Sequence, residues 1–266
     1  MHYLRCRPDR AQAAQLAENV RNSALYDQQL MMYKVNAPLD AQPMEIGRAR
    51  TFSPGWFENE SVWLHMEYKY LLELLRSGLY TEFYRDFRHV FVPFMQPAIY
   101  GRSTLENSSF IVSSANPDPS RHGTGYMARL SGATAEFIHI LHLMAVGEKP
   151  FGLDQEGQLQ LQLRPALPDW LFTAQPQSCT LLLEGQWREQ EFPAHSFSFM
   201  FLGEILVTYH NPGRKDTFGP EGVAPHSWKL TGAAGQIYTF TAPALSGGIA
   251  QQVRDRQIRS IAIELR

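Results

Sequence analysis

The chain has 266 residues, of which 44% are hydrophobic and 19% are charged, and its formal net charge is −2. This balance is typical of a globular protein, and it gives no electrostatic argument for binding nucleic acid or an anionic membrane. The two cysteines, Cys6 and Cys179, form no disulfide or metal-binding pattern, and the sequence shows neither a signal peptide nor a membrane-spanning run, so a cytoplasmic protein is expected.

The first half of the chain is predicted to be mainly helical. An apolar periodicity rich in Ala, Leu and Gln predicts a helix over residues 9–30, and a proline-containing loop is expected over residues 34–50. A second helix is predicted over residues 59–77, with Gly78 as its stop, and a third over residues 81–94. Apolar residues on several faces of the second helix indicate that it is buried on most sides.

A long polar segment, residues 100–126, follows these helices. It is rich in Ser, Asn, Gly and Pro, and segments of this length without regular structure are usually functional or disordered. We expect an ordered segment, because four of its apolar residues can anchor it: Leu105, Phe110, Ile111 and Val112. The next helix is predicted from Ser131, as its N-cap, to residue 146, and Gly147 is expected to end it.

The second half of the chain changes to a strand periodicity. Alternating, β-branched or aromatic runs predict six strands, at residues 159–163, 179–184, 197–201, 204–210, 236–241 and 259–265. The predicted fold class is therefore α+β, with a helical domain over residues 1–152 and an antiparallel, β-sandwich-like domain over residues 153–266.

A segment rich in rings and carboxylates, residues 53–70, is the first candidate for a binding function. It contains Trp56, Glu58 and His65 together with further aromatic and acidic residues. Flat rings beside carboxylates suit sugars, which have apolar ring faces and hydroxyl rims. The alternative is an amphipathic helix with a solvated acidic end. In the polar segment that follows, Glu106 and Arg121 are further candidate binding residues, because their loop could converge with the helix bearing Glu58 and His65 and with the helix start at Ser131 and Gly132.

An anion site is predicted where the helix beginning at Ser131 and Gly132 starts. A helix N-terminus offers backbone N–H groups and the positive end of the helix dipole, and His65 could add another donor. Glu58 and His65 are seven residues apart and share a helix face if their helix begins early enough. The alternative is that Ser131 is only an N-cap. The row Glu136, His139 and His142 is interpreted as core or edge histidines, and no metal site is predicted.

Four blocks of the sequence resemble the C-terminal part of the inverting glycoside phosphorylases of glycoside hydrolase family 94. They are GWFENESVWLHMEYKYLLELL, LENSSFIVSSANPDP, RLSGATAEFIHILHLMAVGEKPF and the LQLRPALPDW that follows. Two further segments, MYKVNAPLDAQPMEIGRAR and FLGEILVTYHNPGRKDT, look most like the β-1,2-oligoglucan branch of that family. Together the similar segments cover nearly the whole chain.

The resemblance implies a fold, an activity and site residues. The implied fold is part of an (α/α)6 barrel, over residues 1–152, followed by a β-sandwich. The implied reaction cleaves a β-glucosidic bond with inorganic phosphate and releases α-glucose 1-phosphate, without a further cofactor. His65, Ser131 and Gly132 match the family's phosphate-binding residues, and Glu106 matches a residue that contacts the sugar. The implied ligands are a β-glucan oligosaccharide and phosphate.

The general acid of the family, an Asp, has no counterpart in this sequence. We therefore expect this chain to be a C-terminal portion that needs an N-terminal segment, supplied by another chain or encoded upstream, and to have little phosphorolytic activity alone. One alternative is a non-catalytic carbohydrate-binding protein in which Trp56, Phe57 and Trp63 are stacking platforms. Another is a scaffolding protein whose helices pair with another chain.

Overall fold

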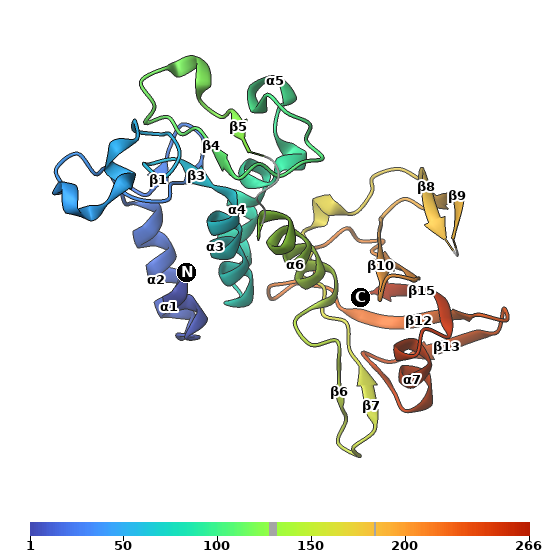
Figure 1. Ribbon diagram of the computed structural model, residues 1–266. Coiled ribbons are helices and arrows are strands. Elements are labelled where there is room, and N and C mark those ends of the chain that lie inside the picture. Colours follow the sequence, from blue (N-terminus) through green and yellow to red (C-terminus); the bar gives the residue numbers. More distant parts are fainter. Residues whose placement is uncertain (128–131, 184) are drawn as a thin grey trace. The chain divides into compact units, whose positions relative to one another are not determined.

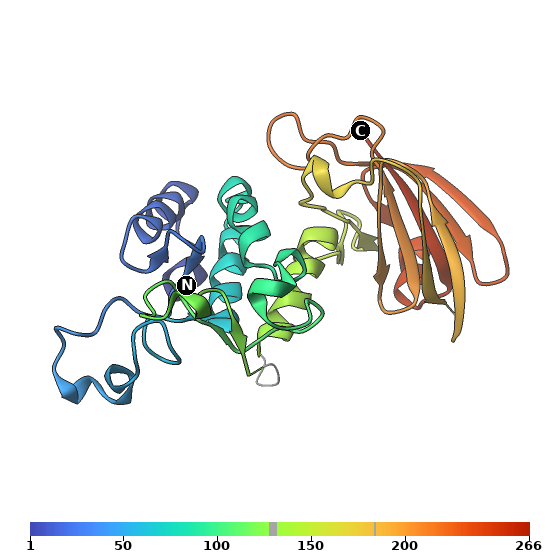
Figure 2. The same ribbon diagram turned by 90° about the horizontal axis from the view of Figure 1, so that it is seen from above.

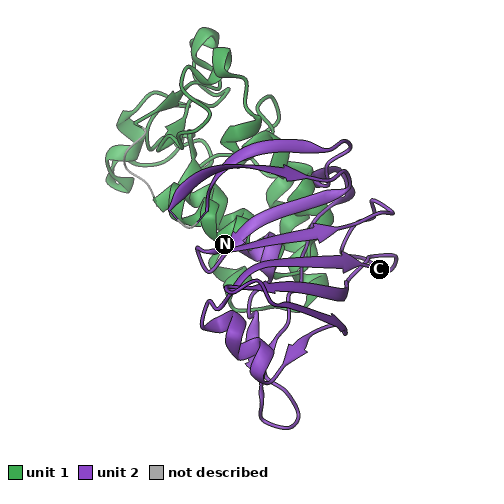
Figure 3. Ribbon diagram, turned by 90° about the vertical axis from the view of Figure 1, so that its right-hand side faces the viewer, with its two compact units in different colours: residues 1–141 green, residues 142–266 purple. Residues whose placement is uncertain are grey.

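The computed structural model describes residues 1–127, 132–183 and 185–266. The fold is mixed α+β, as the sequence predicts, and it divides into two compact units, Met1–Leu141 and His142–Arg266 (Figure 3). The division falls within α6 (Gly132–Val146), whereas the sequence placed the boundary after this helix. Within the described residues, none of the helices has both the length and the apolar character needed to cross a bilayer.

Of the seven α-helices formed by the described residues, the first unit contains five whole and the first ten residues of α6. Besides α6, they are α1 (His2–Arg5), α2 (Arg10–Arg21), α3 (Leu64–Arg76), α4 (Tyr80–Val90) and α5 (Pro97–Tyr100). Short 3₁₀ turns lie between them: η1 (Met44–Ile46), η2 (Arg48–Thr51), η3 (Val92–Phe94) and η4 (Pro119–Arg121). In the described part of the chain these helices do not close into a barrel (Figure 1).

Helix α3 is the centre of the first unit's core. Leu71, Leu72 and Leu74 are each 0% exposed, which confirms that this helix is buried on most sides. It lies beside α4 (Figures 1 and 2), whose Phe83 and Phe87 are also buried. The helix ends where the sequence indicates, since Gly78 has the positive φ of +70° that glycine adopts readily.

Short strands replace the ends of two predicted helices. Helix α2 begins after Asp9, whose carboxylate accepts a hydrogen bond from the Gln12 backbone N–H at 2.9 Å, but it ends at Arg21. The residues beyond it form the hairpin β1 (Tyr26–Asp27) and β2 (Met32–Tyr33). Likewise α3 begins five residues later than predicted, because β3 (Val62–Trp63) pairs with β4 (Phe110–Ile111), which pairs with β5 (Gly125–Tyr126).

The long polar segment is ordered around buried apolar residues. Phe110, Ile111 and Val112 are at most 1% exposed, as expected, but the prediction for Leu105 is wrong because this side chain is 94% exposed. Asp27 joins the segment to the β1–β2 hairpin. Its carboxylate accepts hydrogen bonds from the Ser114 N–H and hydroxyl at 2.7 and 2.8 Å, and from two backbone N–H groups of its own hairpin at 3.0 Å each.

The second unit is built on a five-stranded sheet with the order β10–β11–β15–β12–β13. The strands are β10 (Ser196–Phe201), β11 (Ile205–His210), β12 (Pro225–Gly232), β13 (Ile237–Thr241) and β15 (Ile258–Leu265). Neighbours are antiparallel except β11 and β15, which are parallel. This pair corrects the expectation of a purely antiparallel domain: α7 (Gly248–Arg254) precedes β15 and lets the last strand enter the middle of the sheet.

Smaller sheets complete the second unit. Strands β6 (Phe151–Leu153), β7 (Leu159–Leu161) and β14 (Leu245–Ser246) form one sheet, and β8 (Gln177–Leu183) and β9 (Gln186–Phe192) form a ribbon. A 3₁₀ turn, η5 (Asp169–Leu171), lies before the ribbon. Each of the six predicted strands overlaps an observed one, although residue 184 lies outside the described residues. Strands β6, β9, β12 and β14 were not predicted.

The five-stranded sheet buries one face and exposes the other. Val207, Tyr209, Trp228, Leu230, Ile261 and Ile263 are at most 1% exposed, and they alternate with half-buried or exposed residues, most of them polar, along β11, β12 and β15. This alternation is the period of two that a strand imposes on its side chains. The buried face is the core of the second unit.

The last four carbonyl groups of α6 all have hydrogen-bond partners. Within an α-helix, the last four carbonyl groups have no backbone N–H donor from the helix itself. The donors are the backbone N–H groups of Gly147, Ala166 and Arg164 and the hydroxyl of Tyr209, which bind the carbonyls of Leu143, Met144, Val146 and Ala145 at 3.1, 2.7, 3.0 and 2.8 Å, respectively. Strand β11, which holds Tyr209, therefore fixes the C-terminal turn of α6. Gly147 has a φ of +91°, as expected for the predicted stop.

Candidate functional site

The imidazole of His65 lies directly against the first residue of α6. His65 is the second residue of α3, and a Cβ added to Gly132 would overlap the imidazole carbon between the two ring nitrogens, and both nitrogens. The φ of Gly132 lies outside the left-handed region, so the backbone conformation does not require glycine here. The close approach of the His65 ring does require it.

This contact places a ring nitrogen donor beside a helix N-terminus. The N–H groups in the first turn of an α-helix have no partners within the helix, and the helix dipole adds positive potential there. Anions bind at such positions because several donors converge on them. Ser131, predicted to add a hydroxyl to this group of donors, lies outside the described residues.

Two charged residues, one on each helix, face His65. Glu136 lies one turn after Gly132, with its Oε1 atom 3.7 Å from His65 Nε2, and Lys69 lies one turn after His65. Partial burial lowers the pKa of His65, the positive charge of Lys69 lowers it further, and Glu136 opposes both effects. Near pH 7 the imidazole is therefore mainly neutral, with one N–H to donate.

Sequence analysis did not assign a role to either of these charged residues. The spacing i to i+4 places Lys69 on the same face of α3 as His65, and Glu136 on the same face of α6 as Gly132. This spacing could have indicated that the two charged residues lie beside the predicted anion site. Glu136 was instead considered only together with His139 and His142, as a possible row of metal ligands. In that row, His139 instead contacts Arg76, at 3.1 Å between Nε2 and a guanidinium nitrogen. The described residues contain no group of three or more His, Cys, Asp or Glu that could hold a metal ion.

The polar segment approaches the same helix start through Asn107. Its side chain accepts a hydrogen bond from the Tyr68 hydroxyl at 2.9 Å and donates to the Thr134 hydroxyl at 3.5 Å. The neighbouring Glu106, a predicted sugar contact, directs its carboxylate toward Arg102 at 3.3 Å, and its side chain is 52% exposed. The backbone at Glu106 therefore lies near the start of α6, whereas the Glu106 carboxylate is exposed to solvent.

Glu58 does not share a helix face with His65, which corrects the sequence prediction. Helix α3 begins at Leu64, so Glu58 lies in the preceding loop. Its carboxylate binds the guanidinium of Arg48 through both oxygens, with 2.8 Å between Arg48 Nε and Glu58 Oε2. In this conformation Glu58 forms a partly exposed ion pair with Arg48, which uses one acceptor site on each carboxylate oxygen.

The aromatic residues of the segment pack mainly against one another. Trp56 meets Tyr126 and Phe110 edge to face, with ring centroids 4.7 and 5.3 Å apart, and Phe57 meets Trp63 in the same way at 5.6 Å. These contacts use ring faces that a row of stacking platforms would offer to a sugar. The exposed Arg121 covers Trp56, with its guanidinium carbon 5.7 Å from the ring centroid.

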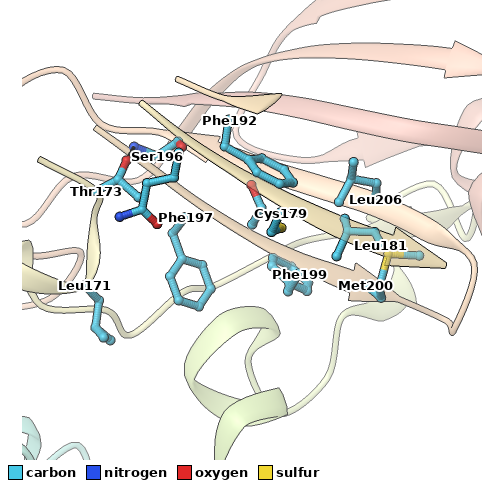
Figure 4. A pocket seen from close by; sticks show the side chains of 12 residues that line it. Leu171, Thr173, Cys179, Leu181, Phe192, Ser196, Phe197, Phe199, Met200 and Leu206 are labelled. Carbon is cyan, nitrogen blue, oxygen red and sulfur yellow. Dashed lines mark hydrogen bonds between the residues drawn. The ribbon is translucent and has the colours of Figure 1, made fainter. Parts of the chain in front are cut away.

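The second unit holds a cavity of about 250 Å³ between the β8–β9 ribbon and β10 (Figure 4). Its lining is Leu171, Thr173, Gln177, Cys179, Leu181, Phe192, Ser196, Phe197, Ser198, Phe199, Met200 and Leu206. The lining contains no Asp, Glu, His, Lys or Arg, so it offers few groups for acid–base chemistry. The convergence of donors around His65 and Gly132 is the stronger candidate site.

Comparison with known proteins does not identify this arrangement. A scan against protein-family models finds no match to the chain, and a search of curated proteins finds no relative.

Proposed function

We propose that this chain forms the phosphate-binding part of a glycoside phosphorylase that cleaves β-glucosidic bonds with inorganic phosphate. The observation that carries the proposal is the contact between the His65 imidazole and Gly132 at the start of α6. The resemblance to glycoside hydrolase family 94 supports it, because the same two residues match phosphate-binding positions of that family. In this proposal the helices of the first unit are part of an (α/α)6 barrel, and the second unit is its β-sandwich-like domain.

The proposed site binds phosphate by hydrogen bonds and by charge. Phosphate oxygens accept from the N–H groups at the start of α6 and from the His65 ring, and the helix dipole and the positive charge of Lys69 favour the anion. At 3.7 Å, Glu136 is beyond a normal hydrogen bond to His65 Nε2. This ring nitrogen is therefore available to an anion.

The proposed reaction is a single displacement with inversion. A phosphate oxygen forms a bond to the anomeric carbon while the bond from that carbon to the glycosidic oxygen breaks, and the departing oxygen takes a proton from a general acid. The products are α-glucose 1-phosphate and a shortened glucan. By resemblance the substrate is a β-1,2-linked oligoglucan, with Glu106 and the Trp56–Arg121 edge as sugar contacts, and the acid is an Asp outside this sequence.

Phosphate binding tests the site without requiring turnover. Phosphorus NMR titration of the full chain with inorganic phosphate should give saturable binding, and His65→Ala should weaken it by about tenfold, because a charge-assisted hydrogen bond of roughly 1.5 kcal/mol is lost. His89→Ala, at an exposed histidine of α4, is the matched control. Equal affinities for the two variants would disprove the phosphate site.

The assignment to a part of the enzyme has a separate test. The chain alone, mixed with β-1,2-glucan oligosaccharides and phosphate, should release little glucose 1-phosphate, because none of its residues matches the general acid of the family that it resembles. Turnover with a typical kcat of about 1–10³ s⁻¹ would show that the acid is present in this chain.

A second candidate function is carbohydrate binding without catalysis, and the exposed face of the five-stranded sheet favours it. His210, Glu264, Ser227 and Thr241 align across four neighbouring strands at the edge of a depression of about 410 Å³, and Lys229 also lines it. Hydroxyl, imidazole and charged groups in one row suit a chain of sugar hydroxyls. This function predicts oligosaccharide binding that is independent of phosphate, unchanged by His65→Ala and weakened by Lys229→Ala.

A further inference from the structure

The cavity between the β8–β9 ribbon and β10 takes no part in either function proposed above (Figure 4). Its volume is about 250 Å³, and all the residues that line it belong to the second unit. Alternate residues of β8, Gln177, Cys179 and Leu181, face it, whereas Leu182 lies on the opposite face of the ribbon. The ribbon therefore forms one wall of the cavity, and the edge strand β10 of the five-stranded sheet forms another.

Apolar side chains from several segments surround this cavity without filling it. They come from η5, both strands of the ribbon, β10 and β11, and they are Leu171, Leu181, Phe192, Phe197, Phe199 and Leu206. Each of the six is half-buried, whereas Phe172 and Phe201 nearby in the sequence are at most 2% exposed. An unfilled apolar space lacks the dispersion contacts of a packed core. A ligand that fills the space would supply these contacts.

The hydroxyl groups on the lining are already engaged within the protein. The Thr173 hydroxyl donates to the carbonyl of Pro193 at 3.0 Å and accepts from the Ser196 N–H at 3.1 Å, and the Ser196 hydroxyl donates to the same carbonyl at 2.7 Å. The Ser198 hydroxyl lies 2.9 Å from that of Thr208. A ligand with many hydroxyl groups, such as a sugar, would find few partners here and would lose its hydrogen bonds to water.

The described residues that line the cavity also provide no charged side chain. The other polar side chains of the lining are the Gln177 amide and the Cys179 thiol, both on exposed residues of β8. Transfer of a carboxylate or an ammonium from water to such surroundings is unfavourable without a partner of opposite charge. The lining therefore favours a ligand without charge.

We propose that this cavity binds a small uncharged molecule with an apolar body of one or two rings, which packs against Leu181 and Phe192 of the ribbon and Phe197 of β10. The volume supports this size, because an engineered apolar cavity of roughly 150 Å³ in another protein binds benzene. The inference does not rest on phosphate binding at His65.

The thiol of Cys179 reports occupancy of the cavity without any substitution. It is free and exposed, and Cys6, the only other cysteine, is also free and exposed but belongs to the first unit. With 2-naphthol at ten times its dissociation constant, alkylation of Cys179 by iodoacetamide should slow by about tenfold, because the occupied cavity covers the thiol. Alkylation of Cys6 should not change. Mass spectrometry of the two cysteine peptides measures both rates in one sample.

Two neighbouring leucines of β8 provide a matched pair of variants. Leu181→Trp places a larger ring in the cavity and should weaken 2-naphthol binding by about tenfold in a ligand-observed NMR titration of the full chain. Leu182→Trp adds the same ring on the opposite face of the ribbon, so affinity should stay within about threefold. His65→Ala should leave binding unchanged.

Two further probes test the ligand class. 2-Naphthoate has the same rings with a carboxylate and should bind at least about tenfold more weakly than 2-naphthol, and a β-1,2-linked glucose disaccharide should not protect Cys179. The proposal is overturned if 2-naphthol does not bind, if it protects both cysteines equally, if the two leucine variants bind it equally, or if naphthoate or the disaccharide binds as tightly. Protection of Cys179 in the unsubstituted chain decides the matter even if Leu181→Trp does not fold.

Discussion

Tyr209→Phe should destabilise the second unit through a single hydrogen bond. The Tyr209 side chain is 0% exposed, and its hydroxyl donates at 2.8 Å to the carbonyl of Ala145 in the last turn of α6. Phenylalanine keeps the ring and its packing, so the substitution removes the donor and leaves a buried carbonyl oxygen without a partner. Such a loss costs about 1–3 kcal/mol of the free energy of unfolding.

Urea unfolding followed by circular dichroism measures this loss. With a slope of roughly 2 kcal/mol per molar urea, a loss of 2 kcal/mol lowers the unfolding midpoint by about 1 M. Tyr238→Phe is the matched control, because this half-buried tyrosine of β13 has no hydroxyl hydrogen bond within the described part of the chain. Its effect should stay within about 0.5 kcal/mol. If both substitutions cost the same, the hydroxyl of Tyr209 does not stabilise the end of α6.

Three further substitutions test the first unit. Gly132→Ala should displace the His65 ring and weaken phosphate binding by about tenfold in the NMR titration, whereas Gly152→Ala, where a Cβ meets no atom within 4 Å, should not. Because Glu67 is neutral when folded but ionises above about pH 4.3 when unfolded, stability should fall by up to roughly 1.4 kcal/mol per pH unit between pH 5 and 7. Urea unfolding at the two pH values should show this fall reduced in Glu67→Gln, and identical slopes would contradict it. Asp86→Ala should cost about 1–3 kcal/mol in the same assay, because it leaves the buried Tyr33 hydroxyl and the Arg21 guanidinium, whose side chain is 25% exposed, without their partner; a cost below about 0.5 kcal/mol would contradict this.

Local sequence patterns predicted the interiors of the elements better than their ends. Helix α3 was predicted from its leucines, which pack on all sides. Its start was missed because Val62 pairs with Ile111, 49 residues later in the chain, and a pairing over this distance leaves no periodicity near residue 62. Strand β12 was missed for a related reason: it begins at Pro225 and contains only two large apolar side chains, and its position between β13 and β15 stabilises it.

The candidate site was predictable to a different degree for each residue. The resemblance paired His65 with Gly132, and no local pattern could have shown that their atoms meet. Trp56 and Trp63 were stacking platforms only in the alternative of a carbohydrate-binding protein, and their ring contacts with Phe110 and Tyr126, from strands far along the chain, leave no signal in the local sequence. Composition identifies a supply of rings, whereas the tertiary fold determines which faces stay free.

The carboxylate of Asp27 has a consequence for motion in the first unit. It accepts four hydrogen bonds, two from its own hairpin and two from Ser114, which is 87 residues away along the chain. Displacement of either loop stretches bonds to the same two oxygens, so we expect the hairpin and the segment at Ser114 to move together. A probe attached to either loop will therefore report the fluctuations of both.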